Sequence, residues 1–516
     1  MYPGAQDPAR PALVMADSGQ VVTFGELDAT ANRFAHLLRS WGVQPGDHLA
    51  YCIENHPVFF DVTWGAHYAG VLYTAMSTRL GADEAAYIVN DCGAKVLVLS
   101  ARYADKAAAI KQATPGVAHH LSVGGAIEGY EPLEDLLAGQ PSTPVDEARI
   151  GGKDMLYSSG TTGKPKGIVP ADLTTPLEEA PIIVTPVLKG LFGVTSDDVY
   201  LSPAPLYHAA PLRFCLAFQQ LGCQVVVMER FDPQRLLDLI AEHRVTHTQL
   251  VPTMFVRLLR LEARARAAAD VSTLKMVLHA GAPCPVDVKQ QMFDWWGPII
   301  HEYYASTEGC GLTWVRPEEW LAKPGSVGKA LIGTPHIVAA DGREAGPGET
   351  GAVFFSDGPR FRYHNDPGKT AENTNAQGWQ TFGDIGHLDE DGFLYLTDRA
   401  SYMIITGGVN VYPQEAEDAL QSHPKVMDAA VFGVPHPEWG EEVKGVVQPV
   451  ELPADDAAAE ALEAELLAYL HERLAKLKCP RSIDFRAELP RHDTGKLYKR
   501  LLKDEYAATA KAAAAA

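Results

Sequence analysis

The feature that most constrains the fold of this 516-residue chain is an alternation of short apolar runs with helical patterns. The apolar runs lack the polar residues of a half-exposed strand, so we expect strands that are covered on both faces. These predicted strands comprise residues 48–53, 96–100, 224–228 and 275–279. Helices are predicted from the Thr23–Glu26 capping box up to Gly42, and over residues 61–68 and 236–243. Such alternation predicts an α/β fold of mostly parallel sheets covered by helices.

The pattern changes near residue 389, where Asp391-Gly392 is a turn signal for a hairpin between two short strands. A compact α+β set is predicted after this hairpin, with its own strands and helices. It comprises strands at 403–406, near 429–432, at 443–450 and near 483, a helix opened by Pro413, and a long helix over about 455–478. We therefore divide the chain into a large N-terminal domain (1–398), a small C-terminal domain (399–506) and a low-complexity tail (507–516).

Charge and cysteine content exclude several classes of function. The formal net charge is −21, so a general nucleic-acid-binding surface and attraction to an anionic membrane are not expected. Seven cysteines without C-x-x-C spacing argue for a reducing cytoplasm and against a disulfide framework or a zinc cluster. No signal segment opens the chain and no apolar run approaches the length of a membrane span. A cytoplasmic protein without an integral membrane segment is predicted.

A loop rich in glycine, hydroxyl groups and lysine joins two apolar runs at residues 157–167, with the sequence Tyr-Ser-Ser-Gly-Thr-Thr-Gly-Lys-Pro-Lys-Gly. Glycines let backbone N–H groups approach a ligand closely, and hydroxyls and lysines add donors and positive charge. The loop therefore favours a polyphosphate ligand, although many such loops are only flexible turns. Pro165 stands where a P-loop requires its second glycine, which indicates another kind of phosphate site.

This loop resembles the signature loop of the adenylate-forming, AMP-binding superfamily, which includes acyl-CoA and aryl-CoA synthetases, luciferases and peptide-synthetase adenylation domains. The family pattern is roughly [YF]-T-S-G-[ST]-T-G-x-P-K-G, and this chain departs from it only by having Ser158 in place of threonine. The resemblance implies that the loop holds the β- and γ-phosphates of ATP. The residues implied in this contact are Ser158, Ser159, Gly160, Thr161, Thr162, Gly163 and Lys166.

Further motifs match the same family in the same order, so that the resemblance covers nearly the whole chain. At 303–309, Tyr-Tyr-Ala-Ser-Thr-Glu-Gly implies that Tyr304 lies against the adenine, Thr307 on the α-phosphate and Glu308 on Mg²⁺. Oxygen ligands are what Mg²⁺ prefers, usually one or two carboxylates together with phosphates. Upstream, residues 279–283 resemble the Gly-Gly-Ala-Pro segment of the family, which implies that Gly281 and Ala282 border the adenine and the acyl group.

Two more matches concern the ribose and the reacting groups. The resemblance implies that Asp384 contacts the ribose hydroxyls. It also implies that Arg399, fifteen residues later, contacts ribose or phosphate. Near the C-terminus, Asp-Thr-Gly-Lys implies that Lys496 bridges the carboxylate of the acid and the α-phosphate, where a cation stabilises developing charge. With His208, which the resemblance places between the ATP and acid sites, the implied catalytic residues are Lys496, Thr307, Glu308 and His208.

The resemblance implies a two-step acid–CoA ligase. Acid and ATP give acyl-AMP and pyrophosphate, and acyl-AMP and CoA then give acyl-CoA and AMP. The small mobile C-terminal domain turns about the Arg399 region between the steps, withdraws Lys496 and presents Gly407, Gly408 and Trp439 to CoA. Family members usually carry Asp or Lys two residues after this arginine, whereas this chain has Ser401, so the usual charge contacts of the hinge are absent.

The implied acid pocket is mostly apolar, and its candidate residues are His208, Phe214, Ala280, Tyr303, Ala305 and Leu312. Such a lining indicates an acid with an uncharged body: a medium-chain fatty, aryl or ring-bearing acid. Two alternatives stay open, namely an adenylating enzyme that loads a carrier protein and a non-catalytic nucleotide-binding relative. Neither the individual acid nor the oligomeric state is fixed by any pattern, so a homodimer also stays open.

Overall fold

The structure is a computed structural model that describes residues 2–145, 149–158, 164–170, 172–406, 409–436, 438–491 and 497–515, with the main chain alone for 400 and 509–515. The chain forms two compact units. Unit 1 comprises Met1–Gln249, Leu261–Val277 and Arg360–Glu372, and unit 2 comprises Leu250–Arg260, Leu278–Pro359 and Asn373–Ala516. Each unit is described below by itself.

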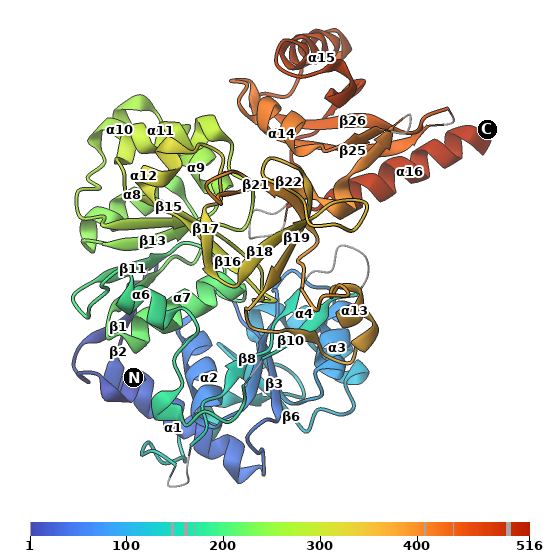
Figure 1. Cartoon of the computed structure of the whole chain (residues 1–516). Helices are drawn as coiled ribbons and strands as arrows, with labels where there is room; N and C mark the ends of the chain where they lie inside the picture. Colours follow the sequence, from blue (N-terminus) through green and yellow to red (C-terminus); the bar gives the residue numbers. More distant parts are fainter. Residues whose placement is uncertain are drawn as a thin grey trace. The chain divides into compact units, whose positions relative to one another are not determined.

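The first sheet of unit 1 has the strand order β7-β6-β5-β3-β4-β8, and all its pairs are parallel. Its strands are β3 (His48–Cys52), β4 (Leu72–Ala75), β5 (Ala94–Ser100), β6 (His119–Val123), β7 (Glu131–Pro132) and β8 (Lys153–Asp154). The helices between and around them are α1 (Phe24–Ser40), α2 (Pro57–Tyr68), α3 (Ala82–Asp91), α4 (Ala104–Ala113) and α5 (Leu133–Leu137), seen in blue and cyan in Figure 1. The Thr23–Glu26 capping box opens α1 as predicted. Five of the seven residues of β5 are buried in succession, which confirms a strand covered on both faces.

A second set of strands in unit 1 is also mostly parallel, with β11 (Val199–Ser202) and β12 (Gln224–Val227) at its centre. Strand β13 (His247–Leu250) and β1 (Pro11–Met15) pair with them in parallel, and β2 (Val21–Thr23) adds an antiparallel edge. The helices of this part are α6 (Thr185–Gly190), α7 (Ala209–Gln220), α8 (Pro233–Glu242) and α10 (Ala263–Ala268). The predicted strands and helices of this region therefore form within about three residues of their expected bounds.

A small antiparallel sheet in unit 1, ordered β20-β10-β9, carries the ends of the glycine-rich loop. Strand β9 (Tyr157–Ser158) precedes the loop, β10 (Lys166–Val169) follows it, and β20 (Arg362–Tyr363) pairs with β10 from the far end of the unit, just before α13 (Pro367–Glu372). The backbone pairing sets Lys166 opposite Ser158.

In unit 2, β15 (Ile300–Ala305), β16 (Leu312–Val315) and β17 (Lys329–Ile332) form antiparallel pairs. The helices nearby in sequence are α9 (Pro252–Leu259), α11 (Val286–Trp296) and α12 (Pro317–Ala322); β14 (Met276–His279) is divided between the two units. A four-stranded antiparallel sheet follows, ordered β18-β19-β21-β22. Its strands are β18 (Thr334–Val338), β19 (Gly351–Ser356), β21 (Asp384–Leu388) and β22 (Leu394–Arg399). The Asp391-Gly392 turn thus lies in a hairpin between β21 and β22, as predicted.

The C-terminal part of unit 2 is an α+β structure around a sheet ordered β24-β23-β26-β25, with β27 beside β26. Its strands are β23 (Ile404–Thr406), β24 (Val409–Val411), β25 (Val426–His436), β26 (Gly440–Pro449) and β27 (Ser482–Phe485). Helices α14 (Gln414–Gln421), α15 (Asp456–His471) and α16 (Lys499–Ala515) complete it (orange and red in Figure 1). The predicted long helix over 455–478 was wrong at its end: α15 stops at His471, and a separate 3₁₀ turn covers Lys476–Lys478. The chain must turn there so that Cys479 and Ile483 join the core under β26.

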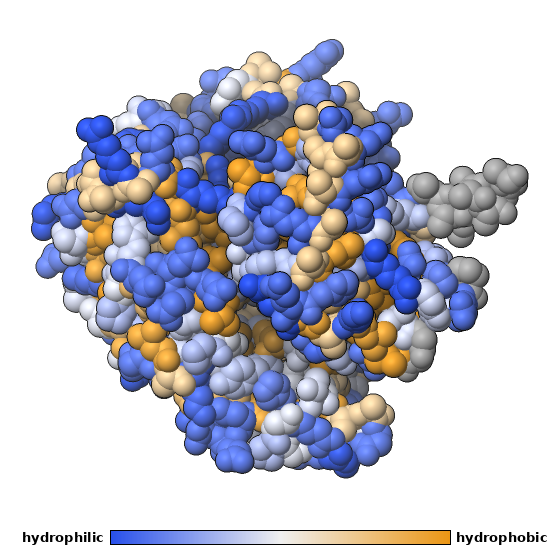
Figure 2. Space-filling model, turned by 90° about the horizontal axis from the view of Figure 1, so that it is seen from above, coloured by the Kyte–Doolittle hydropathy of each residue, from blue (hydrophilic) through white to orange (hydrophobic). Residues whose placement is uncertain are grey.

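The architecture confirms the predicted α/β class, with a large part built on parallel sheets and a small α+β C-terminal part. Among the described residues, no helix is both long and apolar enough to cross a bilayer. On the face shown in Figure 2, hydrophobic side chains are interspersed among hydrophilic ones, and single exposed apolar residues of this kind are normal for a folded protein. The cysteines are free thiols, and all except the half-buried Cys284 are buried.

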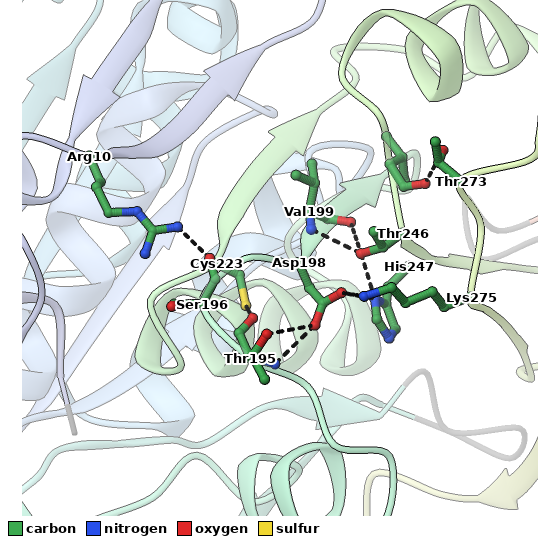
Figure 3. A network of polar contacts seen from close by, with 11 residues as sticks. Arg10, Thr195, Ser196, Asp198, Val199, Cys223, Thr246, His247, Thr273 and Lys275 are labelled. Carbon is green, nitrogen blue, oxygen red and sulfur yellow. Dashed lines mark hydrogen bonds and ion pairs between the residues drawn. The ribbon is translucent and has the colours of Figure 1, made fainter.

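A buried carboxylate ties together the segments around β11 in unit 1 (Figure 3). Asp198, which is 2% exposed, accepts hydrogen bonds from Lys275 Nζ at 2.7 Å and from the Thr195 N–H at 2.9 Å. His247 Nδ1 lies 3.8 Å from the same carboxylate. Burial by itself would raise the pKa of Asp198, but the hydrogen bonds from Lys275 and Thr195 outweigh it and hold the pKa below its usual value.

We expect Asp198→Asn to lower the free energy of unfolding by about 1–3 kcal/mol at pH 7, because a buried charge-assisted hydrogen bond is lost. Since the folded-state pKa is depressed, the stabilisation is complete above the unfolded-state pKa and is lost as the pH falls through the folded value. The wild-type advantage should therefore shrink below about pH 4. Urea unfolding at several pH values measures it, with the exposed neighbour Asp197→Asn as control. An Asp198→Asn deficit that does not change with pH would contradict this account.

Candidate active site

The residues that flank the glycine-rich loop are fixed by backbone pairing in unit 1. Ser158 and Lys166 lie opposite each other, while Ser159, Gly160, Thr161, Thr162 and Gly163 lie outside the described residues. Lys166 Nζ forms an ion pair with Asp366 at 2.7 Å. Gly167 has a steric reason to be glycine, since a Cβ there would lie 2.9 Å from the Tyr157 ring, whose hydroxyl is held by Asp91 at 2.6 Å. The loop thus begins and ends on two paired strands, and Lys166 is the first residue of the second strand.

Three of the predicted nucleotide contacts come together in unit 2. Tyr304 donates a hydrogen bond from its hydroxyl to Asp384 Oδ2 at 2.6 Å, and Arg399 Nε lies 3.3 Å from Asp384 Oδ1. The fifteen-residue spacing of Asp384 and Arg399 is explained by the hairpin, because its register sets these two residues directly opposite each other. Burial and the neighbouring carboxylate raise the pKa of Tyr304 well above its usual value, so its hydroxyl stays protonated and donates. The rings of Phe355 and Phe382 pack beside Tyr304.

The segment after β15 carries the predicted phosphate and metal contacts. Ser306 Oγ donates a hydrogen bond to Glu308 Oε2, and the Gly309 N–H bonds to the Ser306 carbonyl at 3.1 Å in a tight turn where Gly309 has φ +72°. Thr307 lies in this turn, half-buried. In the described part of the chain, no group of three or more His, Cys, Asp or Glu side chains could hold a metal. Glu308 is therefore the single protein carboxylate predicted to bind Mg²⁺, and phosphates and water would supply the other ligands.

Alternation along β15 separates two sets of side chains. Tyr303 pairs with Trp314 and Ala305 with Leu312 across the β15–β16 ladder, so these four residues share one face of the sheet. Tyr304 points to the other face. Three of the four, Tyr303, Ala305 and Leu312, were predicted acid-pocket residues and are half-buried. Trp314, whose ring stacks on Tyr303 at 5.9 Å, was missed, although its two-residue spacing from Leu312 in a strand is a usable signal.

A buried ionic network lies behind these strands and was also missed. Lys289 Nζ is 2.7 Å from Glu302 Oε2 and its side chain is 0% exposed, while His279 Nε2 lies 3.3 Å from the same oxygen. Burial would raise the pKa of Glu302, but Lys289 and His279 lower it to about 2. The network joins α11 to the residues that precede Ala280 and Tyr303, both predicted pocket residues. The sequence signal is a lone lysine within the apolar stripe of α11, beside Val288, Met292, Phe293 and Trp296.

The turn after β14 holds the predicted adenine-bordering residues. Gly281 has φ +87°, a conformation that favours glycine, and Ala280 is buried beside it, while Ala282 follows half-buried. His208 and Phe214 belong to unit 1. His208 is the N-cap of α7 with its ring 4.5 Å from that of Tyr207, and Phe214 is buried in the same helix.

Trp439 is the predicted CoA contact that the described residues of the C-terminal part include. Gly407 and Gly408 lie outside the described residues, but β23 and β24 pair on either side of them. Gly440 pairs with Thr406, which sets the preceding Trp439 next to this hairpin. The Trp439 indole stacks with His436 at 4.1 Å and contacts the Arg481 guanidinium at 3.6 Å. The stacking on His436 and the cation–π contact with Arg481 together hold the indole in one orientation.

Lys496 lies outside the described residues, and its neighbours are anchored on this sheet. Arg491 and Leu497 form a backbone bridge, and the Tyr498 N–H bonds to the Pro490 carbonyl at 2.8 Å. Leu497 is buried with Phe432 and Leu489. The segment that carries Lys496 therefore begins and ends at one fixed place on the C-terminal part.

Two family models match the chain. One described as AMP-binding enzyme matches residues 3–360, and one described as AMP-binding enzyme C-terminal domain matches residues 415–496. Together they cover the predicted phosphate loop, Tyr304, Glu308 and Lys496.

Individual relatives match over nearly their whole length. The feruloyl-CoA synthase of Amycolatopsis sp is 33% identical over 492 residues, covering 95% of this chain and 94% of that protein. The long-chain-fatty-acid–CoA ligase FadD13 of Mycobacterium tuberculosis is 32% identical over 514 residues, covering 97% of this chain and 96% of the relative. Among solved structures, ATP-bound MatB from Rhodopseudomonas palustris matches with a TM-score of 0.81 at 28% identity, covering 97% of this chain and 96% of that one. The chain therefore belongs to the AMP-binding enzyme family and is an AMP-forming acid–thiol ligase of the CoA synthetase kind.

Proposed function

We propose that this enzyme joins an uncharged, apolar carboxylic acid to CoA through an acyl-adenylate. A carboxylate oxygen attacks the α-phosphorus of ATP and pyrophosphate leaves. The CoA sulfur, having lost its proton, then attacks the acyl carbonyl and AMP leaves. The observation that carries the choice of acid is that Tyr303, Ala305, Leu312 and Trp314, four uncharged side chains, share one face of β15 and β16.

The names of two relatives support an apolar acid. One acts on a feruloyl group, which is aromatic, and another on long-chain fatty acids. Both acids have an uncharged body, and aromatic side chains such as Tyr303 and Trp314 pack well against either a ring or a chain. Medium-chain fatty, aryl and ring-bearing acids all fit this description, and the half-buried Ala305 is the position that we propose limits the depth of the pocket.

The nucleotide is proposed to bind through Tyr304, Asp384 and Arg399. An ionised carboxylate accepts about four hydrogen bonds, so Asp384 retains capacity for ribose hydroxyls beyond its bonds to Tyr304 and Arg399. Tyr304 would present its ring to the adenine while its hydroxyl stays on Asp384. The arginine, held opposite by the hairpin register, would add a positive charge beside ribose or phosphate.

The phosphates are proposed to be held by Ser158–Gly163, Lys166 and Thr307, with His208 closing the acid site. Lys496 would bridge the attacking carboxylate and the α-phosphate, where a fixed cation stabilises the charge of the pentavalent phosphorus. Glu308 would hold Mg²⁺, which when bound neutralises phosphate charge. Lys166 must exchange its ion pair with Asp366 for a phosphate oxygen, and both side chains are partly exposed, so that exchange is inexpensive.

CoA is proposed as the acceptor, bound along Gly407, Gly408 and Trp439. The orientation of Trp439 by His436 and Arg481 beside the Thr406–Gly440 pair supports a preformed contact for the pantetheine arm. The named relatives that act on CoA support this choice over a carrier protein.

Pyrophosphate release across a panel of fatty, aryl and ring-bearing acids, with and without CoA, tests the proposal. We expect release with apolar acids, a thioester product when CoA is present, and a loss of adenylation of about 100-fold or more for Lys496→Ala. Lys503→Ala, in helix α16 and paired with Glu441, is the control. Adenylation at the wild-type rate by Lys496→Ala would refute the assigned chemistry. Thioester formed on a carrier protein but not on CoA would move the acceptor to the carrier protein.

Ala305 is expected to set the length of the acids that are accepted. Ala305→Leu adds bulk on the proposed pocket face and should lower kcat/KM for the best wild-type acid about tenfold or more, shifting preference to shorter acids. Ala305→Gly should shift it to longer ones. A series of straight-chain acids measures this, and KM for ATP should stay unchanged. Ala330→Leu, an exposed position on β17, is the matched control. If Ala305→Leu lowers activity equally for every chain length, Ala305 does not line the pocket.

A further inference from the structure

A buried ammonium group in the C-terminal part has no role in the chemistry described above. Lys499, the first residue of α16, is 5% exposed, and its Nζ lies 2.8 Å from Glu417 Oε1 in α14. Glu417 is itself 3% exposed and accepts a hydrogen bond from the Val431 N–H at 2.6 Å. Lysine is almost never buried unless it is paired, so the burial of Lys499 depends on its ion pair with Glu417.

The surroundings of Lys499 are the residues of the predicted hinge. Its Nζ lies 4.8 Å from the centre of the Tyr402 ring, and it interacts electrostatically with Asp398 and Asp418. Asp398, next to the end of β22, accepts hydrogen bonds from the Arg399 N–H at 2.6 Å and the Gln414 N–H at 3.0 Å. The ammonium thus pairs with Glu417 in the helix after the hinge, and that helix is joined at its first residue, Gln414, to Asp398 in the strand before the hinge.

The buried carboxylates show how much depends on this one cation. Burial raises the pKa of Glu417 to about 7, with Lys499 opposing the shift, and burial raises the pKa of Asp418 to about 6. Burial also raises the pKa of Asp398, and Lys499 opposes that shift too. Without Lys499, the buried carboxylate of Glu417 would lose its cation, and a buried unpaired charge is strongly destabilising.

Lys499 also lies close in the chain to the proposed catalytic lysine. It follows Lys496 by three residues, and the intervening Leu497 is anchored by its backbone bridge to Arg491 and by burial with Phe432. Leu497, which directly follows Lys496, is thus separated from Lys499 by a single residue. At the hinge itself, Ser401 is uncharged, and the ammonium of Lys499 lies beside the ring of its neighbour Tyr402.

We propose that Lys499 is a positioning residue that couples the hinge, Asp398–Tyr402, to the Lys496 segment and sets that segment for adenylation. The inference rests on the proposed function. Rotation of the backbone between Asp398 and Tyr402 changes the distance between Asp398 and the Lys499–Glu417 pair, because the two lie on opposite sides of the hinge. The attraction therefore favours the hinge arrangement in which Lys499 meets both carboxylates.

The test separates the two half-reactions. Pyrophosphate release measures adenylation, and thioester formation from supplied acyl-AMP and CoA measures the second step. We expect Lys499→Met to slow adenylation by roughly 10- to 100-fold, since small displacements of a catalytic group have effects of this size. The second step should change by less than about threefold, because it uses the lid with Lys496 withdrawn. Lys499→Arg, which keeps the charge, should recover part of the adenylation rate.

The double variant Lys499→Met with Glu417→Leu distinguishes positioning from folding. Replacing a buried ion pair by apolar side chains removes the unpaired charge, so the stability lost in Lys499→Met should largely return. A positioning role predicts that adenylation stays slow in this stable double variant, because the link to Asp398 is still missing. Recovery of both half-reactions would instead show a purely structural role and overturn the inference.

Lys503→Met provides the matched control, since Lys503 lies one turn further along α16 in a half-exposed ion pair with Glu441. Both half-reactions of this variant should stay within about twofold of wild type. Equal loss of both half-reactions in Lys499→Met and in the double variant would also overturn the inference. A wild-type enzyme that forms no acyl-AMP from any acid would refute the proposed function instead, so the two failures are distinguishable.

Discussion

The antiparallel pairing of β21 with β22 is the constraint on which the nucleotide end of the candidate site depends. Its register sets Asp384 opposite Arg399, and the same carboxylate accepts a hydrogen bond from the hydroxyl of Tyr304 in β15. Backbone hydrogen bonds therefore place the carboxylate opposite the guanidinium, and a side-chain hydrogen bond adds the phenol, without any contribution from a ligand. Such pre-organisation lowers the entropic cost of binding a nucleotide, because these polar groups are already oriented.

Buried charges support the two parts of unit 2 in the same way. Lys289 and Glu302 join α11 to β15, while Lys499 and Glu417 join α16 to α14. A buried ion pair contributes little net stability compared with a well-packed apolar pair, yet removing one partner is costly. Each pair therefore restricts how its elements can be arranged: the first behind the strands of the proposed acid pocket, the second beside the hinge. These pairs therefore fix the relative positions of the elements that they join.

The sequence predicted the short strands, the capping box of α1 and the β21–β22 hairpin, because each of these depends on local patterns of apolar residues and turn residues. Motifs also predicted Tyr304, Asp384 and Arg399 as nucleotide contacts, and the structure brings these three side chains together. What the sequence missed depends on tertiary packing. Lys499 looks like a surface lysine in its own helix, and only packing shows that it is buried against Glu417. Lys289 stands in an apolar stripe, but the stripe does not indicate that Glu302 is its partner. The prediction that the helix continues beyond His471 was wrong for the same reason. The sequence pattern there is helical, but the packing of Cys479 and Ile483 requires the chain to turn.

Alternation along β15 gives a physical reason why one fold can activate different acids with the same chemistry. Tyr304 belongs to one face of this strand and Tyr303 and Ala305 to the other, so neighbouring residues serve the proposed nucleotide and acid sites separately. A substitution at Ala305, Leu312 or Trp314 changes the volume and shape of the acid face without moving the Tyr304 hydroxyl from Asp384. Differences of a few carbon atoms in that volume are worth about 1–3 kcal/mol each in discrimination between acids. In the proposed site, acid preference can therefore change while Tyr304 keeps its hydrogen bond to Asp384.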